Sequence, residues 1–174
     1  MRDQFIKAMS SAGTTVYVVT TDGTAGQHGV KVSAMSSVSA DMGDPTLLVC
    51  IHHLSPAADA IIENKVFAVN MLRSDQSQIS NTFAGRVAEG DSKFDHVDWH
   101  KLETGVPILT DALVSFDCTL YQKERVGTHY IFIGGVVGIH HPEEGDADPA
   151  LFWRDAAAGV GPARLHGRWS RWPL

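Results

Sequence analysis

The sequence predicts a mainly β fold with short helices, arranged as a closed or nearly closed antiparallel barrel. Three observations lead to this prediction. About six segments of the 174-residue chain have the composition of β-strands. Most of them follow one another without an intervening helix, which disfavours a parallel, doubly wound sheet. No GxGxxG motif follows a predicted strand, so a Rossmann dinucleotide site is not expected.

The first third of the chain is expected to form one short helix followed by strands. Asp3 can cap a helix whose apolar residues Phe5, Ile6 and Met9 share one face. The expected strands, rich in β-branched residues or alternating in polarity, are TTVYVVTT (14–21), GVKVSAMSSVSA (29–40) and TLLVCI (46–51). The turn-forming DGTAG at 22–26 makes the second of these the returning strand of a hairpin.

Two further short helices and the longest strands are expected in the rest of the chain. Ser55 and Pro56 favour a helix start, and Ser74 can cap a helix that runs through Ile79 and Phe83. The remaining expected strands are KVFAVNML (65–72), LVSFDCTLYQKERV (113–126) and THYIFIGGVVGIHH (128–141). Polar loops are expected at 85–107 and 142–149.

Composition and charge exclude several classes of protein. The formal net charge of −6 argues against a nucleic-acid partner, and no apolar segment is long enough for a membrane span. The segment MRDQFIKAMSS lacks the apolar centre of a signal peptide, so a cytoplasmic location is expected. Cys50 and Cys118 are expected to be inert core thiols. The chain is expected to be one domain, 1–174, with its core at about 5–155 and a C-terminal tail at 156–174.

The segment 29–40 is unusual because Ser33, Ser36, Ser37 and Ser39 occupy a predicted strand, where serine packs poorly. A flat heteroaromatic ligand can lie against a strand only where side chains are small. Its ring edge then needs hydroxyls and backbone N–H groups. The alternative is a serine-rich strand that faces solvent.

Anion-binding groups are expected near this segment. CIHHLS (50–55) ends at a predicted helix N-terminus, where a phosphate is stabilised, and AGR (84–86) adds an arginine. Two other kinds of site are disfavoured. The adjacent pairs His52–His53 and His140–His141 point to opposite faces of a strand and do not chelate a metal easily. A serine hydrolase would need a nucleophile elbow such as GxSxG, and none occurs.

Several blocks together resemble one family. They follow in the order TTVYVVTT, HGVKVSAMSSVSA, LLVCIHHLS, FAVNML, FAGR, FDHVDW, ETGVPIL and GTHYIFIGGV. This order is similar to that of the short-chain flavin reductases, the NAD(P)H-dependent reductase components of two-component flavin monooxygenases. The resemblance spans about Phe5 to Arg154. It implies an FMN-binding split β-barrel of antiparallel Greek-key type and a homodimer.

The resemblance also implies a set of site residues. Those expected to bind the flavin are Lys31, Val32, Ser33, Ala34, Met35, Ser37, Val38, Cys50, Ile51, His52, Ser55, Phe83, Ala84 and Gly85. Those expected to contact the nicotinamide nucleotide are His129, Phe152, Trp153, Arg154 and Asp155. No catalytic residue and no metal are expected, because the hydride passes directly between the cofactors.

The chain departs from the family pattern at three places. Lys31 stands where members commonly have threonine or another small residue. The turn at 41–46 is longer than the usual one. Thr128 replaces the acidic residue that precedes the family's histidine, here His129.

The resemblance implies an NAD(P)H:flavin oxidoreductase that uses FMN or FAD with NADH or NADPH, NADH being favoured. It would supply free reduced flavin to a separate monooxygenase that acts on an aromatic substrate. Two alternatives are open: a flavin-binding electron carrier or sensor without nicotinamide turnover, and a structural barrel that binds no flavin.

Overall fold

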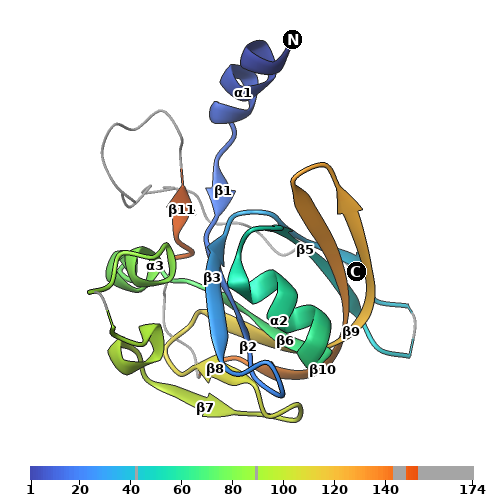
Figure 1. Ribbon diagram of the computed structural model, residues 1–174, viewed down its shortest axis with the longest axis vertical. Coiled ribbons are helices and arrows are strands. Elements are labelled where there is room, and N and C mark those ends of the chain that lie inside the picture. Colours follow the sequence, from blue (N-terminus) through green and yellow to red (C-terminus); the bar gives the residue numbers. More distant parts are fainter. Residues whose placement is uncertain (42, 89, 143–147, 153–174) are drawn as a thin grey trace.

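A seven-stranded antiparallel sheet forms the body of the protein in the computed structural model, which describes residues 1–41, 43–88, 90–142 and 148–152. Its strand order is β3-β2-β6-β9-β10-β5-β4 (Figure 1). The strands are β2 (Tyr17–Thr21), β3 (His28–Val32), β4 (Met35–Ser39), β5 (Thr46–His52), β6 (Val66–Met71), β9 (Val114–Val126) and β10 (His129–His140). The predicted mainly β class and the antiparallel barrel are confirmed.

Smaller elements surround this sheet. Two short pairs of strands are β1 (Thr14–Thr15) with β11 (Leu151–Phe152), and β7 (Trp99–Lys101) with β8 (Pro107–Leu109). The helices are α1 (Arg2–Ser10), α2 (Pro56–Asn64), α3 (Ser77–Phe83) and a 3₁₀ turn at Lys93–His96. Helix α1 stands out from the barrel beyond β1 (Figure 1). None of the helices in the described ranges is long and apolar enough to cross a membrane.

The prediction of a single strand at 29–40 is wrong, because the segment forms two strands, β3 and β4. These two strands occupy opposite edges of the sheet, yet only Ser33 and Ala34 separate them in the chain. The sheet must therefore curl until its two edge strands come close, although they do not pair with each other. The backbone N–H of Cys50 in β5 donates to the Ala34 carbonyl at 3.0 Å, which holds the crossing against β5. The barrel is split where β3 and β4 part.

Alternating side chains of the strands divide the core into two layers. Tyr17 and Val19 of β2 pack inside the barrel, in one cluster with Phe67, Phe132 and α2 residues including Ile61. Val16 and Val18 point the other way, into a cluster with Leu72, Phe83 and Phe94 that lies under α3 and the 3₁₀ turn. Each layer thus holds one group of helices against the sheet.

Several predicted boundaries differ from the observed ones. The segment 14–21 is interrupted at Val16, because its N–H donates to Ala150 and its carbonyl accepts from Leu72 instead of continuing a ladder. Helix α3 starts after Gln76 and not after Ser74. The expected loop 85–107 contains the 3₁₀ turn, which the Ser92 hydroxyl caps by accepting from the Phe94 N–H, and strand β7.

Candidate functional site

A cavity of about 660 Å³ opens between helix α1, strand β3 and the end of strand β5. The Ser33–Ala34 crossing lies in its wall, so the split between the sheet edges is also where the cavity forms. A volume of several hundred cubic ångströms is typical of small-molecule and cofactor sites.

Eight of the fourteen residues predicted to bind flavin line this cavity. They are Lys31, Val32, Ser33, Ala34, Cys50, Ile51, His52 and Ser55. His129, predicted to contact the nicotinamide nucleotide, lines the same cavity. The segments 31–34 and 50–55 meet there because the Cys50 N–H of β5 donates to the Ala34 carbonyl. His129 joins them because β10 pairs with β5.

The lining combines apolar and polar groups. Val32 and Ile51 are buried and present apolar surface. Ser33 and Ser55 supply hydroxyls, and Ser55 is the N-cap residue of α2, although its side chain makes no capping hydrogen bond. Cys50 is a free, half-buried thiol, and burial raises its pKa, which keeps it protonated and unreactive near neutral pH.

The other six predicted flavin residues do not line the cavity. Met35 packs against the barrel core, while Ser37 and Val38 are exposed on the edge strand β4. Phe83 is 1% exposed and lies in the second core layer, whereas Ala84 and Gly85 are exposed just after α3.

The predicted nicotinamide residues near the C-terminus are mostly beyond the described residues. Phe152 belongs to β11, which pairs with Thr14 of β1. Trp153, Arg154 and Asp155 lie outside the described residues.

Three histidines gather at the β5–β10 end of the cavity. His129 is the cross-strand partner of His52, and their rings meet edge to face with centroids 5.0 Å apart. His53 stacks on His52, also at 5.0 Å. The Thr128 hydroxyl lies 3.0 Å from His129 Nδ1, in the place where the family has an acidic residue. Among the described residues, no group of three or more metal-ligating side chains is arranged to hold a metal ion.

A backbone hydrogen bond determines which ring nitrogen of His52 can act as a donor. Its Nδ1 accepts a hydrogen bond from the backbone N–H of Leu54 at 3.2 Å. A backbone N–H can only donate, so Nδ1 carries no proton in this conformation and the ring presents Nε2–H as a donor. Burial, followed by the charges of Arg125 and His52, lowers the pKa of His53. The lowered pKa favours the neutral form of His53 beside the cavity.

Sequence reasoning missed the contribution of the N-terminal segment. Phe5, Met9 and Ala12 line the cavity, together with Thr14 and Val16. The signal was present, since Phe5 and Met9 were predicted to share one helical face. That face is 63% exposed at Phe5 and 48% exposed at Met9, so it does not serve the core.

Comparison with known proteins places the chain in a family. The profile of the flavin reductase like domain matches residues 9–161. The chain is 42% identical over 137 residues to FMN reductase (NADH) RutF of Acinetobacter baylyi, covering 79% of this chain and 71% of that protein.

Solved structures agree with this placement. The flavin reductase PheA2 is 31% identical, with a TM-score of 0.78 over 94% of this chain and 100% of that one. Nitrilotriacetate monooxygenase component B from Mycobacterium thermoresistibile is 26% identical, with a TM-score of 0.83 over 99% of this chain and 92% of that one. The chain therefore belongs to the flavin reductase like family and is a flavin oxidoreductase.

Proposed function

We propose that this flavin reductase binds FMN in the 660 Å³ cavity and reduces it with NADH. The observation that carries the proposal is the meeting, in one cavity, of eight residues predicted to bind flavin with the histidine predicted to contact the nucleotide. The choice of FMN and NADH is supported by the relative RutF, whose name gives both cofactors.

The residues present fit a flavin nucleotide. Val32 and Ile51 offer apolar contact to a flat ring, and Ala34 leaves room for it to approach the backbone. The hydroxyls of Ser33 and Ser55 can bind the polar ring edge and the ribityl chain. Lys31 supplies positive charge for the phosphate. When bound, the flavin supplies the hydride acceptor and NADH supplies the hydride.

His129 is proposed to orient the nicotinamide nucleotide. Its side chain lines the cavity at the start of β10 and is exposed, so a nucleotide arriving from solvent can reach it. His52 presents Nε2–H beside it and can donate to the same ligand. Phe152, Trp153, Arg154 and Asp155 stay predicted nicotinamide contacts, supported by the resemblance alone.

The test is the oxidation of NADH, followed by absorbance, with FMN, FAD or no flavin added. We expect oxidation that depends on added flavin, with NADH preferred over NADPH. A protein that purifies yellow but oxidises no NADH would instead be an electron carrier or sensor. A protein that quenches no flavin fluorescence would contradict any flavin function.

We further infer that the reduced flavin leaves for a separate monooxygenase that acts on an aromatic substrate. Support for the monooxygenase comes from the related component B of nitrilotriacetate monooxygenase, and the aromatic substrate rests on the resemblance. After anaerobic reduction by NADH, ultrafiltration should recover reduced flavin in the filtrate. Retention of the reduced flavin on the protein would contradict a diffusing carrier.

A single-domain homodimer is proposed for the assembly. The exposed apolar residues Phe5, Ile6 and Met9 of α1 provide surface that a second copy could cover. Light scattering coupled to size exclusion should give twice the monomer mass. A monomer at micromolar concentration would contradict this proposal without affecting the reductase proposal.

A further inference from the structure

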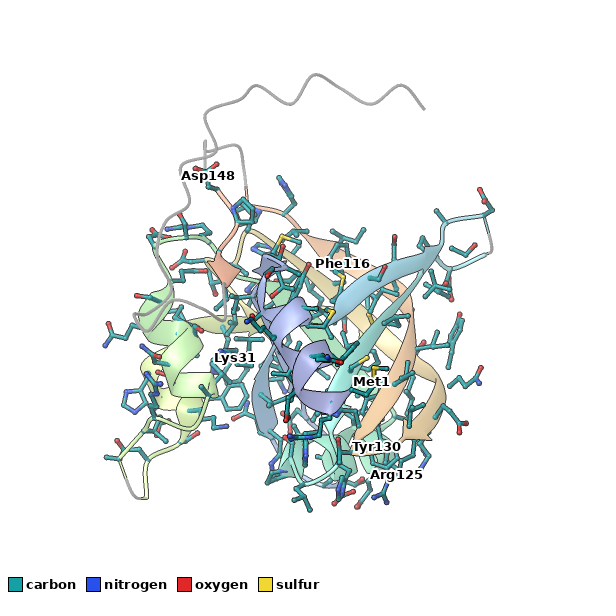
Figure 2. All side chains as sticks on the ribbon, turned by 90° about the horizontal axis from the view of Figure 1, so that it is seen from above. Met1, Lys31, Phe116, Arg125, Tyr130 and Asp148 are labelled. Carbon is teal, nitrogen blue, oxygen red and sulfur yellow. The ribbon has the colours of Figure 1, made fainter. Side chains whose placement is uncertain are left out.

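Helix α1 places a stripe of apolar side chains along the cavity. Phe5 and Met9 are four residues apart and therefore share one face of the helix, and Ala12 continues this α1 stripe just beyond the helix end. All three line the cavity together with the Ser33–Ala34 crossing. Figure 2, in which the protein is seen from above, shows α1 in front of the barrel with Lys31 of β3 to its left. The helix therefore forms one wall of the cavity.

The α1 stripe does not belong to the core of the protein. Phe5 and Met9 are both exposed, and within residues 2–10, all of which the structure describes, Ser10 is the one buried residue. A helix of nine residues is marginally stable in water on its own, and most helices owe their stability to an apolar face that packs against a partner. In α1 this face lines the cavity, so a ligand in the cavity would complete its packing.

The chain that follows α1 is fixed to the body of the protein. Thr14 of β1 pairs with Phe152 of β11, and the Val16 N–H donates to the Ala150 carbonyl at 2.9 Å. Thr14 and Val16 line the same cavity as the α1 stripe. These backbone contacts hold the base of the helix at the cavity, which keeps the stripe within reach of a bound ligand.

The side chains of the α1 stripe suit the ring of a flavin better than its other parts. A phenyl group packs favourably on the face or edge of another aromatic system, and a methionine thioether adapts to the outline of such a ring. Val32 and Ile51 add apolar surface from the barrel. A ribityl chain or a phosphate would gain no hydrogen bond from Phe5 or Met9, so the ring is the part that fits this wall.

The α1 stripe lies at the edge of the family pattern. The profile of the flavin reductase like domain begins at residue 9, so Met9 is the first residue that it matches and Phe5 precedes it. A contribution of α1 to the cavity is therefore a feature of this chain that does not follow from its membership in the family.

We propose that α1 is a cofactor-binding element, in which Phe5 and Met9 contact the isoalloxazine ring of the bound flavin. The inference rests on the proposed function, because it takes the ligand of the cavity to be a flavin. It gives a role in ring binding to two apolar side chains that the fold itself leaves exposed.

The experiment measures the dissociation constants of FMN and riboflavin for Phe5→Ala and Met9→Ala by quenching of flavin fluorescence. Each variant should weaken binding by about three- to tenfold, since covering about half of an apolar side chain contributes about half the free energy of burying it completely. The factor should be the same for both flavins, because they share the ring and differ in the phosphate. The melting temperature of the flavin-free protein should stay unchanged, because both side chains are exposed without ligand.

Two further variants separate contact with the ring from other effects. Ile6→Ala removes an apolar side chain from the same helix that does not line the cavity, and should change both dissociation constants by less than about twofold. Phe5→Leu keeps part of the apolar contact and should retain more affinity than Phe5→Ala. Light scattering on each variant measures the mass of the assembly.

Other outcomes overturn the inference in distinct ways. A lowered melting temperature of the flavin-free variants would mean that the stripe acts through the fold. Unchanged flavin affinity with a halved mass would assign the stripe to contact with a second copy, and a raised KM for NADH alone would assign it to the nicotinamide. Variants that bind flavin as tightly as an active wild type would refute the role of α1 alone, whereas a wild type that binds no flavin would refute the reductase proposal as well.

Discussion

At the scale of single residues, Gly29 determines how closely α3 approaches β3. A Cβ atom at this position would lie 2.7 Å from Phe83 Cδ1 and 3.3 Å from Phe94 Cζ. Phe83 is 1% exposed and Phe94 is 7% exposed, so neither ring has space to retreat. The missing side chain lets the second core layer close behind the residues that line the cavity.

Gly29→Ala should therefore destabilise the fold by about 1–3 kcal/mol through overpacking. Gly135→Ala is the matched control. Its Cβ would lie 2.5 Å from Tyr121 Cε1, but Tyr121 is 54% exposed and can turn outward, losing its hydrogen bond to Asp44. Urea unfolding should show the larger loss for Gly29→Ala, and equal losses would mean that Phe83 moves freely.

His129 yields a prediction about function at the same scale. His129→Ala should raise the KM for NADH by about tenfold, the cost of one hydrogen bond to a charged or strongly polar group, while the FMN dissociation constant stays within about twofold. Steady-state kinetics and flavin fluorescence measure the two quantities. If FMN affinity falls and the KM for NADH does not, the histidine belongs to the flavin side of the cavity.

At the scale of elements, the buried side-chain amide of Asn70 links its own strand, β6, to three other strands. The Asn70 side chain in β6 donates to the Val18 carbonyl of β2 at 3.0 Å. Its oxygen accepts from the Leu109 N–H of β8 at 2.9 Å and from the Ser115 hydroxyl of β9 at 2.8 Å. Asn70 is fully buried, so water cannot replace these partners easily.

Asn70→Ala should cost about 2–4 kcal/mol of stability, because it leaves several buried polar groups without partners. Ser115→Ala removes only one of the bonds and should cost about 1 kcal/mol. Chemical unfolding of both variants measures the difference. A small effect of Asn70→Ala would mean that water enters and satisfies the freed groups.

His100 in β7 should make the stability of the fold depend on pH. His100 of β7 meets His140 of β10 edge to face, with centroids 4.5 Å apart, and burial followed by the charge of His140 lowers the pKa of His100. As the pH falls through 6.5, the ordinary pKa of histidine, His100 therefore takes up a proton more readily in the unfolded chain than in the folded one. Stability should fall as pH decreases through this value.

Thermal unfolding between pH 7.5 and 5.5 checks this expectation. His100→Gln should make the melting temperature decrease less over this range. Part of the decrease should remain, because the pKa of His53 is also lowered. An unchanged slope in His100→Gln would assign the dependence to other groups.

Local patterns predicted most of these elements, and long-range contacts account for the misses. The expected strands at 46–51, 65–72 and 128–141 correspond closely to β5, β6 and β10, because apolar segments rich in β-branched residues favour buried strands. The division of 29–40 depends on the curl of the whole sheet. The residues Phe5 and Met9 reach the cavity through tertiary placement of α1, which periodicity alone does not give.

At the scale of the whole molecule, the cavity lies at the split of the barrel, so a ligand there contacts both sides of the opening. Lys31 belongs to β3, and Cys50 and His52 belong to β5 at the other side. The short crossing and the hydrogen bond from the Cys50 N–H to the Ala34 carbonyl join these two sides, and Val32 and Ile51 share one buried cluster. A bound flavin nucleotide should act as an additional cross-link.

FMN should therefore stabilise the folded state, by about 2.7 kcal/mol at a free concentration one hundred times its dissociation constant. The melting temperature should rise with FMN concentration, and less with riboflavin at the same concentration. Differential scanning calorimetry measures both. A melting temperature independent of FMN would mean that the native state does not bind it.

The serines of β4 have a different consequence, which concerns self-association. Ser33, which precedes β4, lines the cavity, whereas Ser36 and Ser37 of β4 are exposed. Strand β4 pairs with β5 alone and has an irregular register between Ser37 and Ser39. A polar, interrupted edge strand is a poor template for another chain, and proteins use such edges to prevent sheets from joining side by side. The segment 29–40 thus lines the cofactor cavity with its first half, up to Ala34, while the polar serines of its second half make the open edge of the barrel a poor site for edge-to-edge association.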